Sequence, residues 1–267
     1  TSTDSTNAMQ VTGTYTADGE TNLDAVIFSR SDVTLNGTGT LNIVSSQGNG
    51  ISSKDDLKIT GGTYSIKSLL DSLEANDSIL INNGTITIES GKDALHSEND
   101  EDAALGYIVI FNGTLNITAA DDAIRANSYF QMDGGTINID TCTEGIEATM
   151  ITINDGQITM YATNDGINAA PKVSGEVAIV VNGGTINLTI GPGDTDAFDS
   201  NGSITINGGT ITIDATSAFD ADGQAVLNGG DVTVNGEKIT EIIMSQPGGG
   251  KGPGGGMGPG GKGPGQH

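Results

Sequence analysis

The chain has 267 residues, and its 34 acidic and 10 basic side chains give a formal net charge of −24. This balance excludes nucleic acid and anionic membrane surfaces as direct partners, because both bind to positive protein surfaces, whereas cations are favoured. Cys142 is the single cysteine, so no intramolecular disulfide can form, and no apolar run approaches the roughly 18 residues that span a bilayer.

The N-terminal part shows little periodicity. Residues 1–10 are polar and aperiodic, and we expect them to be disordered. The Thr- and Ser-rich residues 1–6 are typical of the trimmed N-terminus of an exported protein, so we expect an extracellular or cell-surface location. Residues 11–37 contain strand-like segments with weak repeat character, as expected of a terminal turn that caps a solenoid.

Close copies of one segment, residues 133–139 (DGGTINI), recur through most of the chain. The last glycine of each copy marks the repeat, and successive markers lie 22, 29, 22, 21, 28, 25 and 21 residues apart. The markers are Gly62, Gly84, Gly113, Gly135, Gly156, Gly184, Gly209 and Gly230. A strand-like unit of this length signals a solenoid, in which each turn buries its apolar face against the next. We therefore predict one elongated domain over residues 11–244.

Each repeat divides into three short strands. The first follows the glycine and alternates polar and apolar residues, as in residues 136–139, so one face points inward. The second reads acidic, small, apolar, variable, small, as in residues 71–75, and the third reads apolar, variable, apolar, as in residues 79–81. Asn-Gly-Gly turns then tolerate the positive φ of a sharp bend. Three strands per turn of about 22 residues predict an all-β, single-stranded parallel β-helix.

Insertions interrupt the repeat at a few corners. Two lie between a second and a third strand, at residues 98–106 and 171–176, and one follows a first strand at residues 191–193. Such corners are where a solenoid places its binding site. Residues 245–267 are rich in Gly and Pro and are predicted to form a flexible tail.

Stacking places equivalent residues above one another, so the acidic position generates a column of carboxylates. Its members are Asp71, Asp93, Asp122, Glu144, Asp165 and Asp196. The variable position three residues later and its surroundings add Glu74, Asp121, Glu147, Asp199 and Asp220. Carboxylates repeated about every 4.8 Å repel one another unless cations lie among them, and dense oxygen ligands favour Ca²⁺ over Zn²⁺ or copper. We predict several Ca²⁺ ions here; the alternative for any one member is a cap on backbone N–H groups.

Two outward surfaces are candidates for a polymer. Small residues that follow the acidic position are expected to point outward and form a shallow trough, in which Ca²⁺ bridges a glycan to the protein; the alternative is that they relieve crowding at a tight corner. They are Ser72, Ala94, Ala123, Gly145, Gly166, Ala197 and Ala218. Thr and Asn columns on the first strands offer hydrogen bonds to a glycan or to ice, or reflect β propensity alone. With no Trp and five scattered Tyr residues, no aromatic platform for cellulose is predicted.

Catalysis is a competing hypothesis. Elimination from an acidic polysaccharide uses Ca²⁺ and a Lys or Arg that removes a proton. The basic residues near the acidic column are Lys92, His96 and Arg125, of which Lys92 or Arg125 is the candidate base. In the alternative, they neutralise neighbouring carboxylates. Together with Asn168, these three form the predicted ligand-binding set.

The repeated Asn-Gly-Gly-Thr-Ile-Asn-Ile units, the Asp-Ala-Ile and Asp-Gly-Ile columns and the Gly/Pro/Lys tail resemble a family of bacterial surface carbohydrate-binding β-helix proteins. The resemblance covers residues 11–244. It implies a right-handed parallel β-helix similar to pectate lyases, several Ca²⁺ ions, binding to cellulose and polygalacturonate-type polymers, and no established cleavage. We therefore expect a Ca²⁺-dependent polysaccharide-binding protein, with a polysaccharide lyase and an ice-binding or adhesive solenoid as alternatives.

Overall fold

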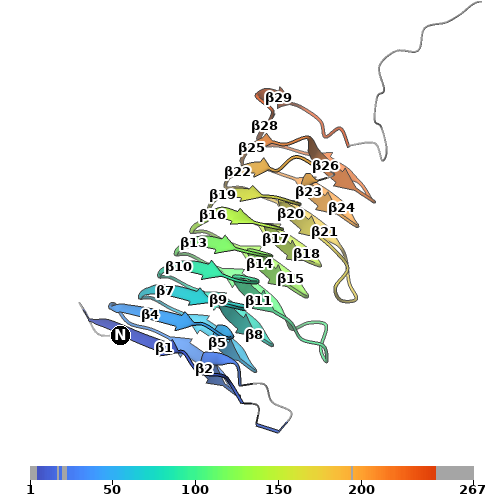
Figure 1. The fold of residues 1–267 in the computed structure, drawn as a ribbon. Helices are drawn as coiled ribbons and strands as arrows, with labels where there is room; N and C mark the ends of the chain where they lie inside the picture. Colours follow the sequence, from blue (N-terminus) through green and yellow to red (C-terminus); the bar gives the residue numbers. More distant parts are fainter. Residues whose placement is uncertain (1–4, 17, 20–22, 194, 245–267) are drawn as a thin grey trace, which may run out of the picture.

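The chain folds into a stack of turns that each contribute one strand to three sheets. A computed structural model describes residues 5–16, 18–19, 23–193 and 195–244, which form 29 strands (Figure 1). Within these described ranges, no helix is long and apolar enough to cross a membrane. The predicted tail, residues 245–267, lies outside the described residues.

The first sheet has eleven strands, and all its pairs are parallel except the last, β28 with β29. Its strands are β1 (Thr6–Val11), β4 (Thr40–Ser45), β7 (Thr63–Ser68), β10 (Thr85–Ser90), β13 (Thr114–Ala119), β16 (Thr136–Cys142), β19 (Gln157–Ala162), β22 (Thr185–Ile190), β25 (Thr210–Asp214), β28 (Asp231–Val234) and β29 (Glu237–Ile239).

The second and third sheets have nine strands each. The second contains β2 (Ala25–Ser29), β5 (Asn49–Ser53), β8 (Leu73–Ala75), β11 (Leu95–Ser97), β14 (Ile124–Ala126), β17 (Ile146–Ala148), β20 (Ile167–Ala169), β23 (Asp196–Ser200) and β26 (Ser217–Ala221). The third contains β3 (Val33–Leu35), β6 (Asp56–Ile59), β9 (Ser78–Ile81), β12 (Tyr107–Ile110), β15 (Tyr129–Met132), β18 (Met150–Ile153), β21 (Ala178–Val181), β24 (Ser203–Ile206) and β27 (Ala225–Leu227). Because successive strands enter different sheets and each strand pairs with its equivalent one turn away, the predicted parallel β-helix with three strands per turn is confirmed.

The core consists of stacked aliphatic columns. From β10 to β28 of the first sheet, the register aligns one inward residue from each turn, and every member of this run is fully buried. The column runs through Ile86, Leu115, Ile137, Ile158, Ile186, Ile211 and Val232. Each buried Ile contributes about 1.5–3 kcal/mol, and each column contacts only its neighbouring turns.

The marker glycines form the corner between the third and the first sheet. Gly135 has a φ of 86°, and a Cβ placed on it would lie 2.7 Å from the carbonyl oxygen of Gly113 in the preceding turn. Any larger residue would therefore combine backbone strain with a clash. The glycine that marks each repeat is therefore required by the close approach of successive turns at this corner.

The expectation that residues 1–10 are disordered is wrong for residues 6–10. Strand β1 (Thr6–Val11) pairs in parallel register with β4, although five of its six residues are exposed. Its sequence lacks the alternation of a half-buried strand because the pairing depends on backbone hydrogen bonds rather than on burial of side chains. The cap over the first complete turns therefore includes this polar strand.

The small residues of the second-strand motif point inward, which corrects the prediction of an outward trough. Ser72, Ala94, Ala123 and Ala197 are fully buried, and the alanines belong to the hydrophobic core. A Cβ on Gly145 would lie 2.2 Å from the carbonyl oxygen of Gly166 and 2.5 Å from Met160 Sδ. These residues are small because the corner folds tightly over the side chains of the first sheet.

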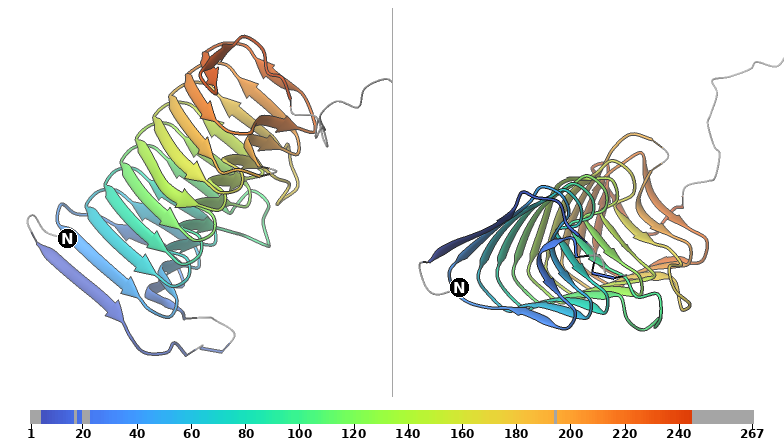
Figure 2. Two further views of the ribbon diagram at one scale, coloured as in Figure 1. Left: turned by 45° about the horizontal axis from the view of Figure 1, so that its top comes forward. Right: turned by 60° about the horizontal axis from the view of Figure 1, so that its bottom comes forward.

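Two longer loops project from the solenoid at the predicted insertion points. They connect β11 to β12 and β20 to β21, and they extend on the same side of the stack (Figures 1 and 2). The first loop is attached through Asn99, whose Nδ2 donates a hydrogen bond of 2.7 Å to Asp77 Oδ1. The second is attached through Thr149, whose Oγ1 accepts hydrogen bonds from the backbone N–H groups of Lys172 and Val173. Both loops therefore have fixed positions beside the sheets.

Candidate functional site

A ladder of acidic residues follows the corner between the first and the second sheet. We call this set the corner ladder: Asp71, Asp93, Asp122, Glu144, Asp165 and Asp196. Five of them precede their strand in the second sheet, and Asp196 opens β23. The predicted stacking of the acidic position is confirmed. In most turns, however, the acidic residue lies at the corner and not within the second strand, where the sequence pattern places it.

Several ladder carboxylates cap the backbone of the next turn. The backbone N–H of Asp93 donates to Asp71 Oδ1 at 3.0 Å, that of Asp122 to Asp93 Oδ1 at 3.1 Å, and that of Asp196 to Asp165 Oδ1 at 2.7 Å. Asn49 holds the equivalent place in an earlier turn, where its Oδ1 accepts from the N–H of Asp71 at 3.0 Å. The capping alternative is therefore correct for these aspartates, and it occupies one oxygen of each carboxylate.

A second polar series lies on the outward face of the second sheet. The register aligns one residue from each turn, and we call the series the outward column: Ser52, Glu74, His96, Arg125, Glu147, Asn168, Asp199 and Asp220. His96, Glu147 and Asn168 are buried, with 6–8% of their surface exposed, whereas equivalent outward residues of the first sheet, such as Thr85, are exposed. The column and the corner ladder together form a recessed polar strip.

At the N-terminal end of the strip, basic groups compensate the acids. Lys92 Nζ lies 3.2 Å from Asp71 Oδ2 and 3.5 Å from Asp93 Oδ2, and His96 Nδ1 lies 3.2 Å from Asp71 Oδ2. Burial favours the neutral acid, but the hydrogen bond and charge of His96, with the charge of Lys92, outweigh it and lower the pKa of Asp71. Burial also opposes the charged forms of His96 and Lys92, yet the contacts with these aspartates raise the pKa of both.

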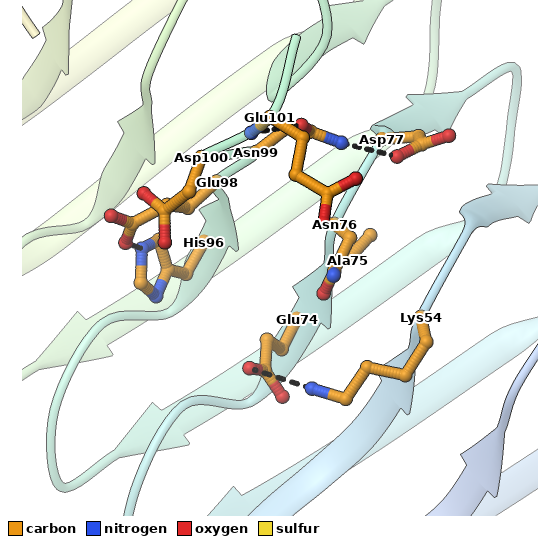
Figure 3. A pocket seen from close by; sticks show the side chains of 10 residues that line it. All are labelled: Lys54, Glu74, Ala75, Asn76, Asp77, His96, Glu98, Asn99, Asp100 and Glu101. Carbon is orange, nitrogen blue, oxygen red and sulfur yellow. Dashed lines mark hydrogen bonds and ion pairs between the residues drawn. The ribbon is translucent and has the colours of Figure 1, made fainter. Parts of the chain in front are cut away.

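A cavity of about 450 Å³ opens beside this group. Lys54 and Glu74 lie on one side of it, and His96 and Glu98 lie on the other (Figure 3). His96 Nε2 is 3.0 Å from Glu98 Oε2, and Lys54 Nζ is 3.7 Å from Glu74 Oε1. Glu74 also accepts a hydrogen bond of 2.7 Å from Asn49 Nδ2, so its contacts are those of an ion pair rather than of a carboxylate cluster.

In the middle of the strip, carboxylates outnumber their basic partners. Two three-residue groups share one member: Asp93, Asp121 and Asp122, and Asp122, Glu144 and Glu147. Within each group, one oxygen of every carboxylate lies within 4.8 Å of the others. Burial, followed by the charges of Asp93, Glu144, Glu147 and Asp121, raises the pKa of Asp122 to about 8. Burial and the charge of Glu147 also raise the pKa of Glu144.

The donor set of these groups fits a hard divalent cation. Asp93 Oδ2 is buried and has no hydrogen-bond partner in the described part of the chain, although Lys92 Nζ is 3.5 Å away. Arg125 Nε, which also lacks a hydrogen-bond partner there, is 3.8 Å from Glu147 Oε2, and Lys172 Nζ is 2.7 Å from Glu147 Oε1. Carboxylate oxygens at this density are the ligands that Ca²⁺ prefers.

The C-terminal end of the strip is acidic but less tightly grouped. Burial and the charges of Asp165, Asp196 and Asp220 raise the pKa of Asp199 to about 6. These four carboxylates do not form a three-residue group within 4.8 Å among the described residues. Asn168 lies one turn before Asp199, and its Nδ2 donates a hydrogen bond of 3.1 Å to Glu144 Oε2.

Comparison with known proteins identifies the family. The sequence model of one family, described as carbohydrate-binding domain-containing protein, matches residues 1–197 and 147–238. The chain belongs to this family of carbohydrate-binding domain-containing proteins. A relative in Acetivibrio thermocellus, also described as a carbohydrate-binding domain-containing protein, is 44% identical over 45 residues. That match covers 17% of this chain and 16% of the relative's length. No solved structure matches the chain.

Sequence analysis of this carbohydrate-binding domain missed several residues of the strip. Asn49 stands at the ladder position of a frayed repeat, so alignment of the repeats could have found it. Lys172 lies inside a predicted insertion, but its contact with Glu147 depends on how the loop folds back. A further carboxylate group, Asp32, Asp55 and Asp56, lies outside the strip at the start of β3 and β6.

Proposed function

We propose that the chain is a Ca²⁺-dependent polysaccharide-binding protein that takes acidic glycans, such as polygalacturonate, as well as cellulose, without cleaving them. The observation that supports Ca²⁺ most strongly is the pair of carboxylate groups that share Asp122, together with Oδ2 of Asp93, which is buried and has no hydrogen-bond partner among the described residues. Burial and then the charges of neighbouring carboxylates raise the pKa of Asp122, and a divalent cation would neutralise those charges.

The ligand class follows from the charge of the strip and from the family. Carboxylates of a uronate polymer would be repelled by the acidic strip unless a cation lay between them. Ca²⁺ bound by Asp122, Glu144 and Glu147 would supply that cation and accept polymer oxygens as further ligands. Because plant cell-wall polymers lie outside cells, the proposal includes an extracellular or cell-surface location.

The competing lyase hypothesis requires Lys92 or Arg125 to accept a proton. Burial lowers the pKa of both, but the surrounding carboxylates outweigh it, so the pKa of each is raised. A general base must be neutral to act, and both residues are held in the charged form. Their contacts favour a role in neutralising Asp71, Asp93 and Glu147.

The proposal is tested by retention of the protein on immobilised polygalacturonate, with Ca²⁺ and then with chelator. Asp122→Asn combined with Glu144→Gln should abolish Ca²⁺-dependent retention, because both changes remove ligand charge. Glu89→Gln and Asp214→Asn, exposed on the first sheet, remove the same charge outside the strip and should retain binding.

Three results would contradict the proposal. Retention on polygalacturonate that persists in chelator would show that binding does not require Ca²⁺. Unsaturated product that forms in the wild type and is lost in Arg125→Ala or Lys92→Ala would make the protein a lyase. Thermal hysteresis without glycan retention would favour an ice-binding surface on the Thr columns.

A further inference from the structure

A cleft of about 510 Å³ lies over the third sheet, apart from the acidic strip. Ala103 and Ala104 from the first projecting loop form one wall, and Val173–Glu176 of the second loop form the other; strands β15 and β18 form the floor. Both loops are held by the hydrogen bonds of Asn99 and Thr149 described above. The walls therefore have defined positions, and the volume lies in the range of small-ligand sites.

An aromatic pair stands at the edge of this floor. The rings of Tyr107 (β12) and Tyr129 (β15) are stacked with centroids 4.6 Å apart and planes 5° from parallel. Tyr107 therefore covers one face of the Tyr129 ring and fixes its plane. Tyr129 is partly exposed and lines the cleft, and the residue aligned with it in the next turn is Met150, also in the lining. The second face of the Tyr129 ring is turned away from Tyr107.

The remaining lining suits a neutral, hydroxyl-bearing ligand. Gln131 and Thr152 present polar side chains, and Glu176 is the single charged residue among the described lining residues. Ser128 also lines the cleft; it is more than nine-tenths buried, and its Oγ has no hydrogen-bond partner within the described ranges.

We propose that this cleft binds one hexose ring of a neutral glycan, with an apolar face of the sugar stacked on Tyr129. The inference rests on the proposed function in polysaccharide binding and assigns neutral sugars to a site separate from the Ca²⁺-dependent strip. The stack on Tyr107 orders the ring before binding, which lowers the entropic cost of association. Glu176 disfavours an anionic uronate in the same place.

The test is a chemical-shift titration of the ¹⁵N-labelled protein with cellopentaose in the presence of chelator. Amides of β15 and β18 should shift. Tyr129→Ala should weaken binding about tenfold, the equivalent of about 1.4 kcal/mol, whereas Tyr129→Phe should retain it. Tyr161→Ala is the matched control, because Tyr161 is 38% exposed on the first sheet, outside the cleft.

A second variant guards against a folding defect. Thr152→Arg places a long charged side chain in the cleft without removing a core residue, and it should also abolish binding. Both Tyr129→Ala and Thr152→Arg should keep Ca²⁺-dependent retention on polygalacturonate, which shows that they are folded. The inference is overturned if the wild type does not bind cellopentaose, or if both variants bind it as tightly as the wild type does. If the wild type shows no retention on polygalacturonate, the Ca²⁺ proposal alone is contradicted; cellopentaose binding lost in both variants then still supports the cleft, provided that their ¹⁵N spectra outside the cleft match that of the wild type.

Discussion

The backbone N–H of Asp122 donates a hydrogen bond of 3.1 Å to Oδ1 of Asp93, while Oδ2 of the same carboxylate is buried without a hydrogen-bond partner in the described structure. One oxygen thus joins two turns, and the other lies 3.5 Å from Lys92 Nζ, while the carboxylate as a whole belongs to one of the groups that we propose hold Ca²⁺. The structural and the binding roles of the corner ladder can be separated by substitutions that remove only one of them.

Asp93→Asn should preserve the fold and lose Ca²⁺ affinity. The amide oxygen can still accept the N–H of Asp122, as Asn49 does for Asp71, whereas the ligand charge is gone. Asp93→Ala should cost about 1–3 kcal/mol in the free energy of unfolding, because it leaves a buried N–H without an acceptor. In thermal unfolding, the Ca²⁺-induced rise in Tm should be smaller in both variants than in the wild type. Equal midpoints for the Asn and Ala variants in chelator would show that the hydrogen bond contributes nothing.

Without Ca²⁺, the free energy of unfolding should fall as pH rises from about 4 to about 8. The pKa of Asp122 is raised from 3.8 to about 8 in the folded chain, so the folded state binds more protons than the unfolded state across this window. Asp199, with a pKa of about 6, acts in the same sense up to that pH. The pKa of His96 is also raised, so the stability it contributes below pH 6.5 is lost as pH passes through its folded value. One pKa unit corresponds to about 1.4 kcal/mol, and the total fall should exceed this amount.

Denaturant titrations at several pH values measure this dependence. Excess Ca²⁺ should flatten the curve, because the cation replaces the proton on Asp122. In chelator, the unfolding free energy of the Asp122→Asn variant should depend less on pH than that of the wild type, since the substitution removes the carboxyl group whose pKa is raised to about 8. A wild-type stability that rises with pH in chelator would contradict the assigned pKa directions.

Gly135→Ala should destabilise the fold by about 1–3 kcal/mol or more. The residue has a φ of 86°, and the new Cβ would lie 2.7 Å from the Gly113 carbonyl oxygen. Gly13→Ala is the control, because a Cβ at Gly13 meets no atom within 4 Å. Thermal unfolding of the two variants should therefore differ clearly, and similar midpoints would show that the corner relaxes at little cost.

Thr149→Val should loosen the second projecting loop. The hydroxyl accepts two backbone N–H groups of the loop and donates to the Asn127 carbonyl oxygen at 2.7 Å, so its loss leaves polar groups unpaired. We expect a loss of about 1–3 kcal/mol and faster hydrogen exchange at Lys172 and Val173. Thr159→Val, an exposed outward position of the first sheet, should change neither. Unchanged exchange at the two amides in Thr149→Val would mean that the loop is held by other contacts.

The repeat and its alternation were sufficient to predict the three-sheet stack, because the period of the markers and the two-residue period of the strands are properties of the chain itself. The direction of the small corner residues was not predictable in this way. Ala94 and Ala123 precede an inward residue and would point outward in a regular strand, but the tight corner turns them into the core. Strand β1 was missed because its pairing involves the backbone rather than an apolar pattern.

The stacking of acidic positions was also predictable, since equivalent residues of a solenoid align. The different contacts of the two oxygens of Asp93 were not predictable, because they depend on the distance between one carboxylate and one backbone amide in the next turn. The contacts of Lys172 and the stacking of Tyr129 on Tyr107 depend on loop geometry and on side-chain rotation, which sequence periodicity does not specify.

The hydrogen bonds that Asp71, Asp93, Asp122 and Asp196 donate to a ladder side chain of the preceding turn join equivalent positions. One of these turns can therefore be duplicated or deleted as a whole while its neighbour still finds an acceptor at the same position, and Asn49 shows that an asparagine can serve there in place of an aspartate. Each duplication of a turn in the gene would add one carboxylate to the row. The length of polymer that the protein contacts can therefore increase without a change in the core.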